Sequence, residues 1–132
     1  MKVEDVKVLI IEDESYSRAI IRQVLTGLGF VKIHEAEEGG EGFKKTLQVR
    51  PNLVLCDIHM QPVDGMKYLT EIRSVRGEGI SSTPVIFLTS NANERTVKLA
   101  RDLHVDGYLV KPVSANEVKK QIGYVLSIIF PR

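Results

Sequence analysis

Short runs of apolar residues alternate along the chain with longer stretches in which apolar residues recur at helical spacing. Continuous runs cover residues 6–11, 53–56, 84–88 and 107–110, and between the first two Val31 and Ile33 alternate with polar residues. Short runs rich in β-branched residues predict strands, and alternation predicts a strand with one exposed face. The pattern therefore predicts five strands, the second of them half exposed.

A helical pattern follows each predicted strand. The first helix is expected to start at a capping Ser15 or Ser17 and to end at residues 27–29, and the others to cover residues 39–49, 66–75, 93–103 and 115–130. Residues 77–83 are expected to form a loop. Strands that alternate with helices indicate a parallel sheet with helices on both faces. Because strands one, three and four are wholly apolar, they belong in the middle of a doubly wound, flavodoxin-like α/β sheet of order 2-1-3-4-5.

Composition narrows the class of protein. The 132 residues suit a single domain over residues 1–132, and 43% apolar with 27% charged residues is ordinary globular usage. Lys plus Arg is 18 and Asp plus Glu is 17, so nothing suggests direct nucleic-acid binding. One cysteine, Cys56, excludes an internal disulfide and a cysteine zinc site. No signal peptide or membrane span is present, so we expect a cytoplasmic location without membrane insertion.

Polar residues follow the strands at their carboxyl ends, where open α/β sheets bind ligands. Glu12 and Asp13 follow the first strand, Asp57 the third, Thr89 the fourth and Lys111 the fifth. Taken singly, each has an ordinary explanation as a helix terminus, turn, cap or solvated lysine. Their placement at one end of the sheet favours a joint site, and three convergent carboxylates suit Mg²⁺.

Five motifs in order carry a resemblance to a known family. They are residues 9–13 (LIIED), 53–57 (LVLCD), Met60 with Pro62 and 64–65 (DG), 85–89 (VIFLT) and 107–112 (GYLVKP). Together they make residues 6–129 resemble the receiver domain of two-component response regulators, the CheY-like fold. The resemblance implies that Asp57 accepts a phosphoryl group from the phosphohistidine of a sensor histidine kinase or His-phosphotransfer protein.

The resemblance also assigns the surrounding residues. Asp13 and Asp57 would bind Mg²⁺ directly, with Glu12 assisting and the backbone carbonyl of His59 completing the protein ligands. The phosphoryl group would be hydrogen-bonded by Thr89 and paired with Lys111. The family further implies a cis Lys111–Pro112 peptide, an inward turn of the switch residue Tyr108 when Thr89 moves, and control of phosphoryl lifetime by His59 and Asn91.

The resemblance implies that the output lies at the face made by the fourth helix, fifth strand and fifth helix. With Val118, Ile122, Val125 and Ile129 facing inward, Leu126 and Phe130 remain as surplus apolar residues that could mark an interface or simply cover the first helix. We expect phosphorylation-enhanced binding there, to a downstream protein or a second copy, through Arg95, Lys98, Tyr108 and the fifth helix.

Some features depart from the family and keep alternatives open. Pro62 lies one place later than usual because Gln61 intervenes, and Val113 replaces a frequent Phe. A haloacid-dehalogenase-like phosphatase would need an Asp where His59 stands, and a flavodoxin-like carrier would need a phosphate loop where residues 12–14 are acidic. The sequence fits both a stand-alone receiver and a part of a larger regulator.

Overall fold

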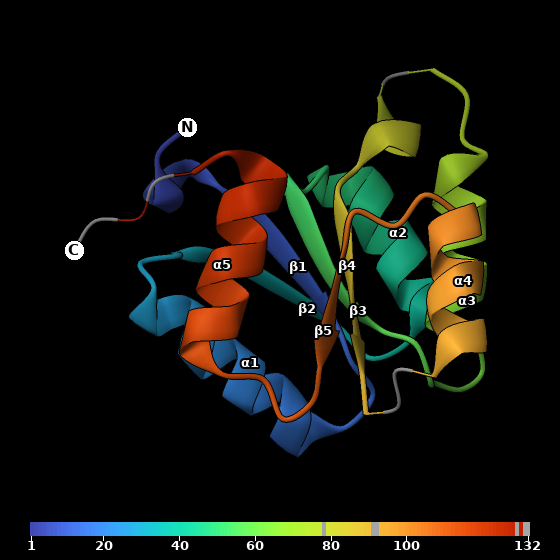
Figure 1. Cartoon of the computed structure of the whole chain (residues 1–132). Coiled ribbons are helices and arrows are strands. Elements are labelled where there is room, and N and C mark those ends of the chain that lie inside the picture. Colours follow the sequence, from blue (N-terminus) through green and yellow to red (C-terminus); the bar gives the residue numbers. More distant parts are fainter. Residues whose placement is uncertain (78, 91–92, 129, 131–132) are drawn as a thin grey trace.

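A five-stranded parallel sheet forms the centre of the computed structural model, which describes residues 1–77, 79–90, 93–128 and 130 (Figure 1). Its strand order is β2-β1-β3-β4-β5, as the pattern predicts. The strands are β1 (Lys7–Ile11), β2 (Lys32–Ala36), β3 (Leu53–Asp57), β4 (Val85–Thr89) and β5 (Gly107–Val110). Every residue of β3 and β4 is buried, which explains why these two segments are apolar up to the polar residue that ends each of them, Asp57 in β3 and Thr89 in β4.

Helices cover both faces of the sheet (Figure 1). They are α1 (Ser15–Gly27), α2 (Gly39–Val49), α3 (Gly65–Arg73), α4 (Glu94–Asp102) and α5 (Ala115–Leu126), with short 3₁₀ turns at Val3–Asp5 and Ile80–Ser82. On one face, Leu25 of α1 and Ile122 of α5 pack with Val8 and Ile10 of β1. On the other, Leu9 packs in a cluster with residues of α3 and α4. Successive β1 residues therefore serve opposite cores.

The start of α1 and the position of β2 differ from the prediction. No serine caps α1, because Ser15 is already helical and Glu14 precedes it without a capping side-chain bond. Strand β2 begins at Lys32, and Val31 before it is 68% exposed. Polar residues occupy most of β2, since this strand lies at the edge of the sheet.

The end of α5 also differs. The helix stops at Leu126 because Ser127 adopts a left-handed conformation (φ 54°), and the Ile128 amide donates back to the Gly123 carbonyl. Phe130 then packs edge-on against Phe30, with ring centroids 5.9 Å apart. Leu126 and Phe130 are thus partly buried against the core that includes Ile21 and Leu25 of α1, which favours the alternative that they cover the first helix. Ile129, predicted to face inward, lies outside the described residues.

Within the part of the chain that the structure describes, no helix combines the length and the apolar character needed to cross a bilayer.

Candidate functional site

The carboxyl ends of the inner strands meet at one edge of the sheet and carry the polar residues with them. Parallel pairing places Ile11 opposite Cys56 and Asp57 opposite Leu88, so the residues that follow these strands are neighbours. Backbone bonds continue beyond the strands: the Glu12 amide donates to Ala36 (3.0 Å) and the Lys111 amide to Thr89 (2.7 Å). The sheet therefore fixes the backbone from which the polar side chains project.

Three carboxylates gather at this edge. One oxygen from each of Glu12, Asp13 and Asp57 lies within 4.8 Å of the other two. Glu12 is 1% exposed and Asp57 6%, whereas Asp13 is exposed. Two buried anions this close to a third would repel one another strongly without a compensating cation.

Lys111 provides one such cation. Its Nζ lies 2.9 Å from Glu12 Oε1 and 3.3 Å from Asp57 Oδ2. Burial opposes the charge on Lys111, but the hydrogen bond to Glu12 and the nearby Asp57 carboxylate outweigh that effect and raise the lysine pKa. The Lys111–Pro112 peptide is cis, as the resemblance implies, and Gln61–Pro62 is cis as well.

One lysine does not satisfy the whole cluster. Glu12 Oε2 is buried without a hydrogen-bond partner among the described residues. Burial, together with the contact to Asp57, raises the pKa of Glu12 to about 7, and Lys111 only partly opposes this. An unpaired buried oxygen beside an all-oxygen donor set is what a hard divalent cation would complete, so the residues present fit Mg²⁺.

Thr89 and Tyr108 extend the site toward β5. Thr89 is fully buried as the last residue of β4. The Tyr108 hydroxyl is shielded from water, and burial raises its pKa while Thr89 opposes the shift. That hydroxyl has no hydrogen-bond partner among the described residues. Tyr108 is therefore turned inward in this structure.

The loop between β3 and α3 forms the other wall. His59 is exposed and lines, with Asp13, Met60, Gln61 and Asp64, a pocket of about 270 Å³. The Gly65 amide closes the loop by donating to the Ile58 carbonyl (2.9 Å). A Cβ at Gly65 would lie 2.4 Å from the Asp57 carbonyl oxygen, so only glycine allows this approach. Asn91, the other residue expected to control phosphoryl lifetime, lies outside the described residues.

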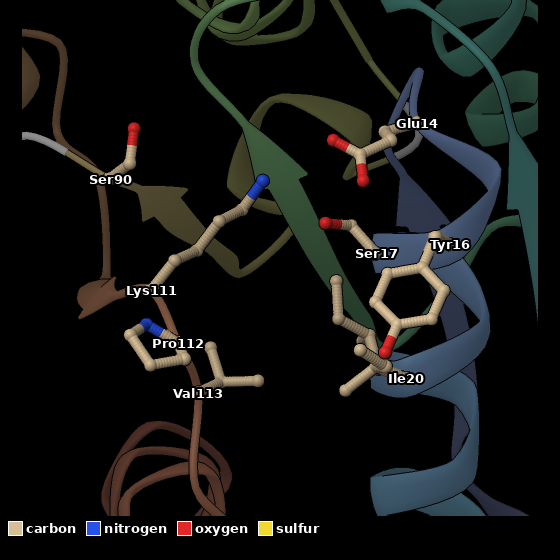
Figure 2. A pocket seen from close by; sticks show the side chains of 9 residues that line it. Glu14, Tyr16, Ser17, Ile20, Ser90, Lys111, Pro112 and Val113 are labelled. Atoms are coloured by element: carbon tan, nitrogen blue, oxygen red, sulfur yellow. The ribbon is translucent and has the colours of Figure 1, made fainter.

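A second depression, of about 410 Å³, opens beside Lys111 and was not predicted (Figure 2). Tyr16, Ser17 and Ile20 of α1 form one side, and Pro112 and Val113 the other. Tyr16 is 72% exposed and Ile20 36%. Two exposed apolar residues four positions apart on a helix were the available sequence signal.

Comparison with known proteins identifies the family to which this fold belongs. The family model described as "response regulator receiver domain" matches residues 8–123. The chain belongs to this receiver family. A probable chemotaxis protein CheY from Rhizobium etli is 30% identical over 126 residues, 96% of each chain. The transcriptional regulatory protein ResD of Bacillus subtilis is also 30% identical, over 95% of this chain but only 50% of its own length.

Solved receiver structures share the fold. The receiver domain of a sensor histidine kinase from Pseudomonas aeruginosa superposes with a TM-score of 0.83 at 23% identity, over 93% of this chain and 98% of its own. That structure carries a magnesium ion coordinated in its active-site cleft. Membership in the receiver family makes this chain a signalling domain of two-component systems, a family in which phosphorylation and Mg²⁺ binding at an acidic pocket are general.

Proposed function

We propose that residues 1–132 act as a single receiver domain whose Asp57 accepts a phosphoryl group from a histidine kinase or a His-phosphotransfer protein. In this step an Asp57 carboxylate oxygen attacks the phosphorus of a phosphohistidine. The P–N bond breaks, an acyl phosphate forms on Asp57, and the departing imidazole nitrogen takes up a proton. The observation that carries the proposal is the Asp57 carboxylate, 3.3 Å from Lys111 Nζ inside the acidic cluster.

Each neighbouring residue has a task in this proposal. Glu12, Asp13, Asp57 and the His59 backbone carbonyl would hold Mg²⁺. The Pseudomonas relative, which carries a magnesium ion in its active-site cleft, supports this assignment. Bound Mg²⁺ supplies positive charge that neutralises the transferring phosphoryl oxygens. Lys111 supplies positive charge from the protein and, in this proposal, pairs with the phosphoryl group.

Thr89 and Tyr108 convert the modification into a change of shape. The Thr89 hydroxyl hydrogen-bonds the phosphoryl group, and Tyr108 adjusts its ring position in response. The inward Tyr108 ring and the exposed apolar side chains of Leu99 (47%), Val110 (52%) and Tyr124 (83%) support an output surface on α4, β5 and α5. Binding of a downstream protein or a second copy there is stronger in the phosphorylated form, and only the affinity difference between the two forms carries the signal.

The phosphodonor contacts the depression beside Lys111. Tyr16 and Ile20 offer apolar surface in the depression that Lys111 lines (Figure 2), and Lys111 contacts Asp57. A partner helix that presents a phosphohistidine could cover this surface. Because the donor must bring its histidine to Asp57, a contact surface adjacent to the site is needed on geometric grounds.

The test is Mg²⁺-dependent phosphorylation by acetyl phosphate, followed by intact mass and ³¹P NMR. We expect one added phosphoryl group with an acyl-phosphate signal, and no addition when EDTA removes the metal. A phosphoryl group mapped to another residue would contradict the proposal. The only catalysis proposed is this self-phosphorylation and the loss of the group again, since His59 stands where a phosphatase of the haloacid-dehalogenase type needs an Asp.

A further inference from the structure

Arg18 joins the acidic edge of the sheet to strand β2, although it belongs to no motif of the site. Its side chain projects from the first turns of α1 and is only 15% exposed. Nη1 donates to the backbone carbonyl of Glu12 (2.7 Å), and Nε donates to Glu35 Oε1 (2.9 Å). One guanidinium thus binds a main-chain oxygen at the site and a carboxylate on the edge strand.

The bond to the Glu12 carbonyl fixes the peptide unit that leads into Asp13. The amide of Glu12 is already held by Ala36 of β2 (3.0 Å). With its carbonyl held by Arg18, Glu12 is restrained on both sides, and the Glu12–Asp13 peptide cannot rotate without breaking a charge-assisted hydrogen bond. The exposed Asp13 side chain therefore starts from a fixed backbone.

Arg18 is itself held in place. The second oxygen of Glu35 accepts a hydrogen bond from Arg22 Nη1 (2.8 Å), and Lys45 Nζ donates to the Glu35 backbone carbonyl. A guanidinium has a rigid fork of donors, so it can serve two acceptors in fixed directions. The chain of contacts from Arg22 through Glu35 to Arg18 gives the Glu12 carbonyl a firmly anchored donor.

We propose that Arg18 is a positioning residue for the divalent-cation site, which presets the Glu12 and Asp13 carboxylates by holding the peptide between them. The inference rests on the proposed function, because it takes the acidic cluster to be the Mg²⁺ site. The hydrogen bonds of Arg18 go to the Glu12 backbone carbonyl and to Glu35, and not to the side-chain oxygens of Glu12, Asp13 or Asp57. Its effect on the cluster therefore passes through the backbone.

The charge of Arg18 makes the inference sharply testable. A positive charge near the cluster repels a divalent cation, so if Arg18 acted through charge alone, its removal would tighten Mg²⁺ binding. If Arg18 acts by positioning, its removal weakens binding, because the carboxylates lose their preset arrangement. The two explanations predict opposite signs for the same substitution.

The experiment measures the Mg²⁺ dissociation constant of the full chain by isothermal titration calorimetry, for the wild type, Arg18→Gln and Arg18→Lys. We expect about tenfold weaker binding for Arg18→Gln, at the low end for residues that orient metal ligands. Arg18→Lys keeps the charge but loses the fork, so it should weaken binding to nearly the same extent. Arg76→Gln, the loss of an exposed arginine elsewhere, is the matched control and should bind as the wild type does.

Each result decides the question. Tighter or unchanged binding in Arg18→Gln, or wild-type affinity in Arg18→Lys, would overturn the positioning role while leaving the proposed function intact. No Mg²⁺ binding by the wild type would overturn both. Circular dichroism checks the fold of each variant, and should Arg18→Gln fail to fold, Arg18→Lys alone decides, since it keeps the helix and the charge.

Discussion

The two flanks of Asp57 are built differently. The anchored flank, made of β1, β2 and α1, is tied by ionic contacts that run from Arg22 through Glu35 and Arg18 to the Glu12 carbonyl. The open flank, made of β4, β5 and α4, holds the fully buried Thr89, the Tyr108 hydroxyl without a partner at hydrogen-bonding distance, and the exposed Leu99 and Val110. One flank holds its charged side chains in place through ion pairs, and the other presents the buried Thr89 and the Tyr108 hydroxyl beside exposed apolar side chains.

This contrast suits the proposed function, in which the domain binds a cation and then changes shape on phosphorylation. A metal site gains from ligands that are arranged in advance, because less order is then imposed on binding. A switch needs an element with two arrangements of similar free energy. Lys111 lies between the flanks, bonded to Glu12 on one side and following β5 on the other.

The largest effect is expected at the point where the flanks meet. Asp57→Asn removes the nucleophilic oxygen, so acetyl phosphate and Mg²⁺ should add no phosphoryl group to that residue. Intact mass after a fixed incubation measures this. If Asp57→Asn were phosphorylated as fully as the wild type, Asp57 would not be the phosphoryl acceptor.

Lys111→Met breaks the link between the flanks. Glu12 would lose its ionic partner, and a buried carboxylate left unpaired typically costs about 3–5 kcal/mol. Because the glutamate can take up a proton and Lys111 is 21% exposed, we expect a smaller loss of unfolding free energy, about 1–3 kcal/mol at pH 8. Urea denaturation measures it.

The same variant should lose the response of Tyr108 to beryllofluoride, a phosphoryl mimic, in NMR spectra. A Tyr108 response equal to that of the wild type would show that the open flank senses the phosphoryl group without Lys111.

Glu12→Gln tests the electrostatics of the anchored flank. The pKa of Glu12 is raised from 4.5 to about 7 by burial, so the folded protein holds a proton that the unfolded chain releases. Without metal, the stability of the wild type should therefore fall as the pH rises from about 4.5 to about 7, by on the order of 1–3 kcal/mol. Glu12→Gln should flatten that dependence in EDTA-treated protein.

Denaturation midpoints at several pH values provide the measurement. An equally steep fall in Glu12→Gln would assign the titration to another group. Addition of Mg²⁺ should restore the stability of the wild type at high pH and help the variant less.

Much of the fold can be predicted from the spacing of apolar residues along the chain. The two flanks show which elements this spacing identifies and which it does not. Strands β3 and β4 are buried on both faces, so their sequences are apolar up to the last residue and are easily found. Strand β2 is less readable, because His34 and Glu35 lie inside it and Glu35 is satisfied by arginines of α1. The closeness of Glu12, Asp13, Asp57 and Lys111 could be predicted because parallel strands bring their carboxyl ends to one edge.

Other features leave no pattern in side chains. The Arg18 contact is to a backbone carbonyl, an acceptor that every residue possesses, so no sequence motif marks it. The end of α5 depends on a left-handed Ser127 and on the contact of Phe130 with Phe30, which lie far apart in sequence. Local propensity carries no information about such a contact.

The smallest expected effect tests how tightly α2, which follows the anchored flank in the chain, is packed against the loop between β3 and α3. A Cβ at Gly39, the first residue of α2, would lie 2.7 Å from both Val63 Cγ1 and the Val63 carbonyl oxygen. Gly39→Ala should therefore destabilise the protein by about 1–2 kcal/mol. Gly27→Ala is the matched control: nothing lies within 4 Å of its added Cβ, and in helix α1 it should stabilise by about 0.5 kcal/mol.

Thermal unfolding of both alanine variants provides the comparison. If both changes altered the stability equally, the loop that carries Val63 would move aside easily for a side chain at Gly39, and α2 would not be tightly packed against it.

Cys56 has a practical consequence for spectroscopy of the proposed change of shape. It is the only cysteine, fully buried beside Asp57, and its thiol donates to the Asp57 carbonyl oxygen (3.2 Å). Burial raises its pKa well above the ordinary value, so little reactive thiolate forms. A cysteine introduced for Tyr124, which is 83% exposed, would thus react alone with a spin label or fluorophore. The native chain is already a background-free host for site-directed labelling.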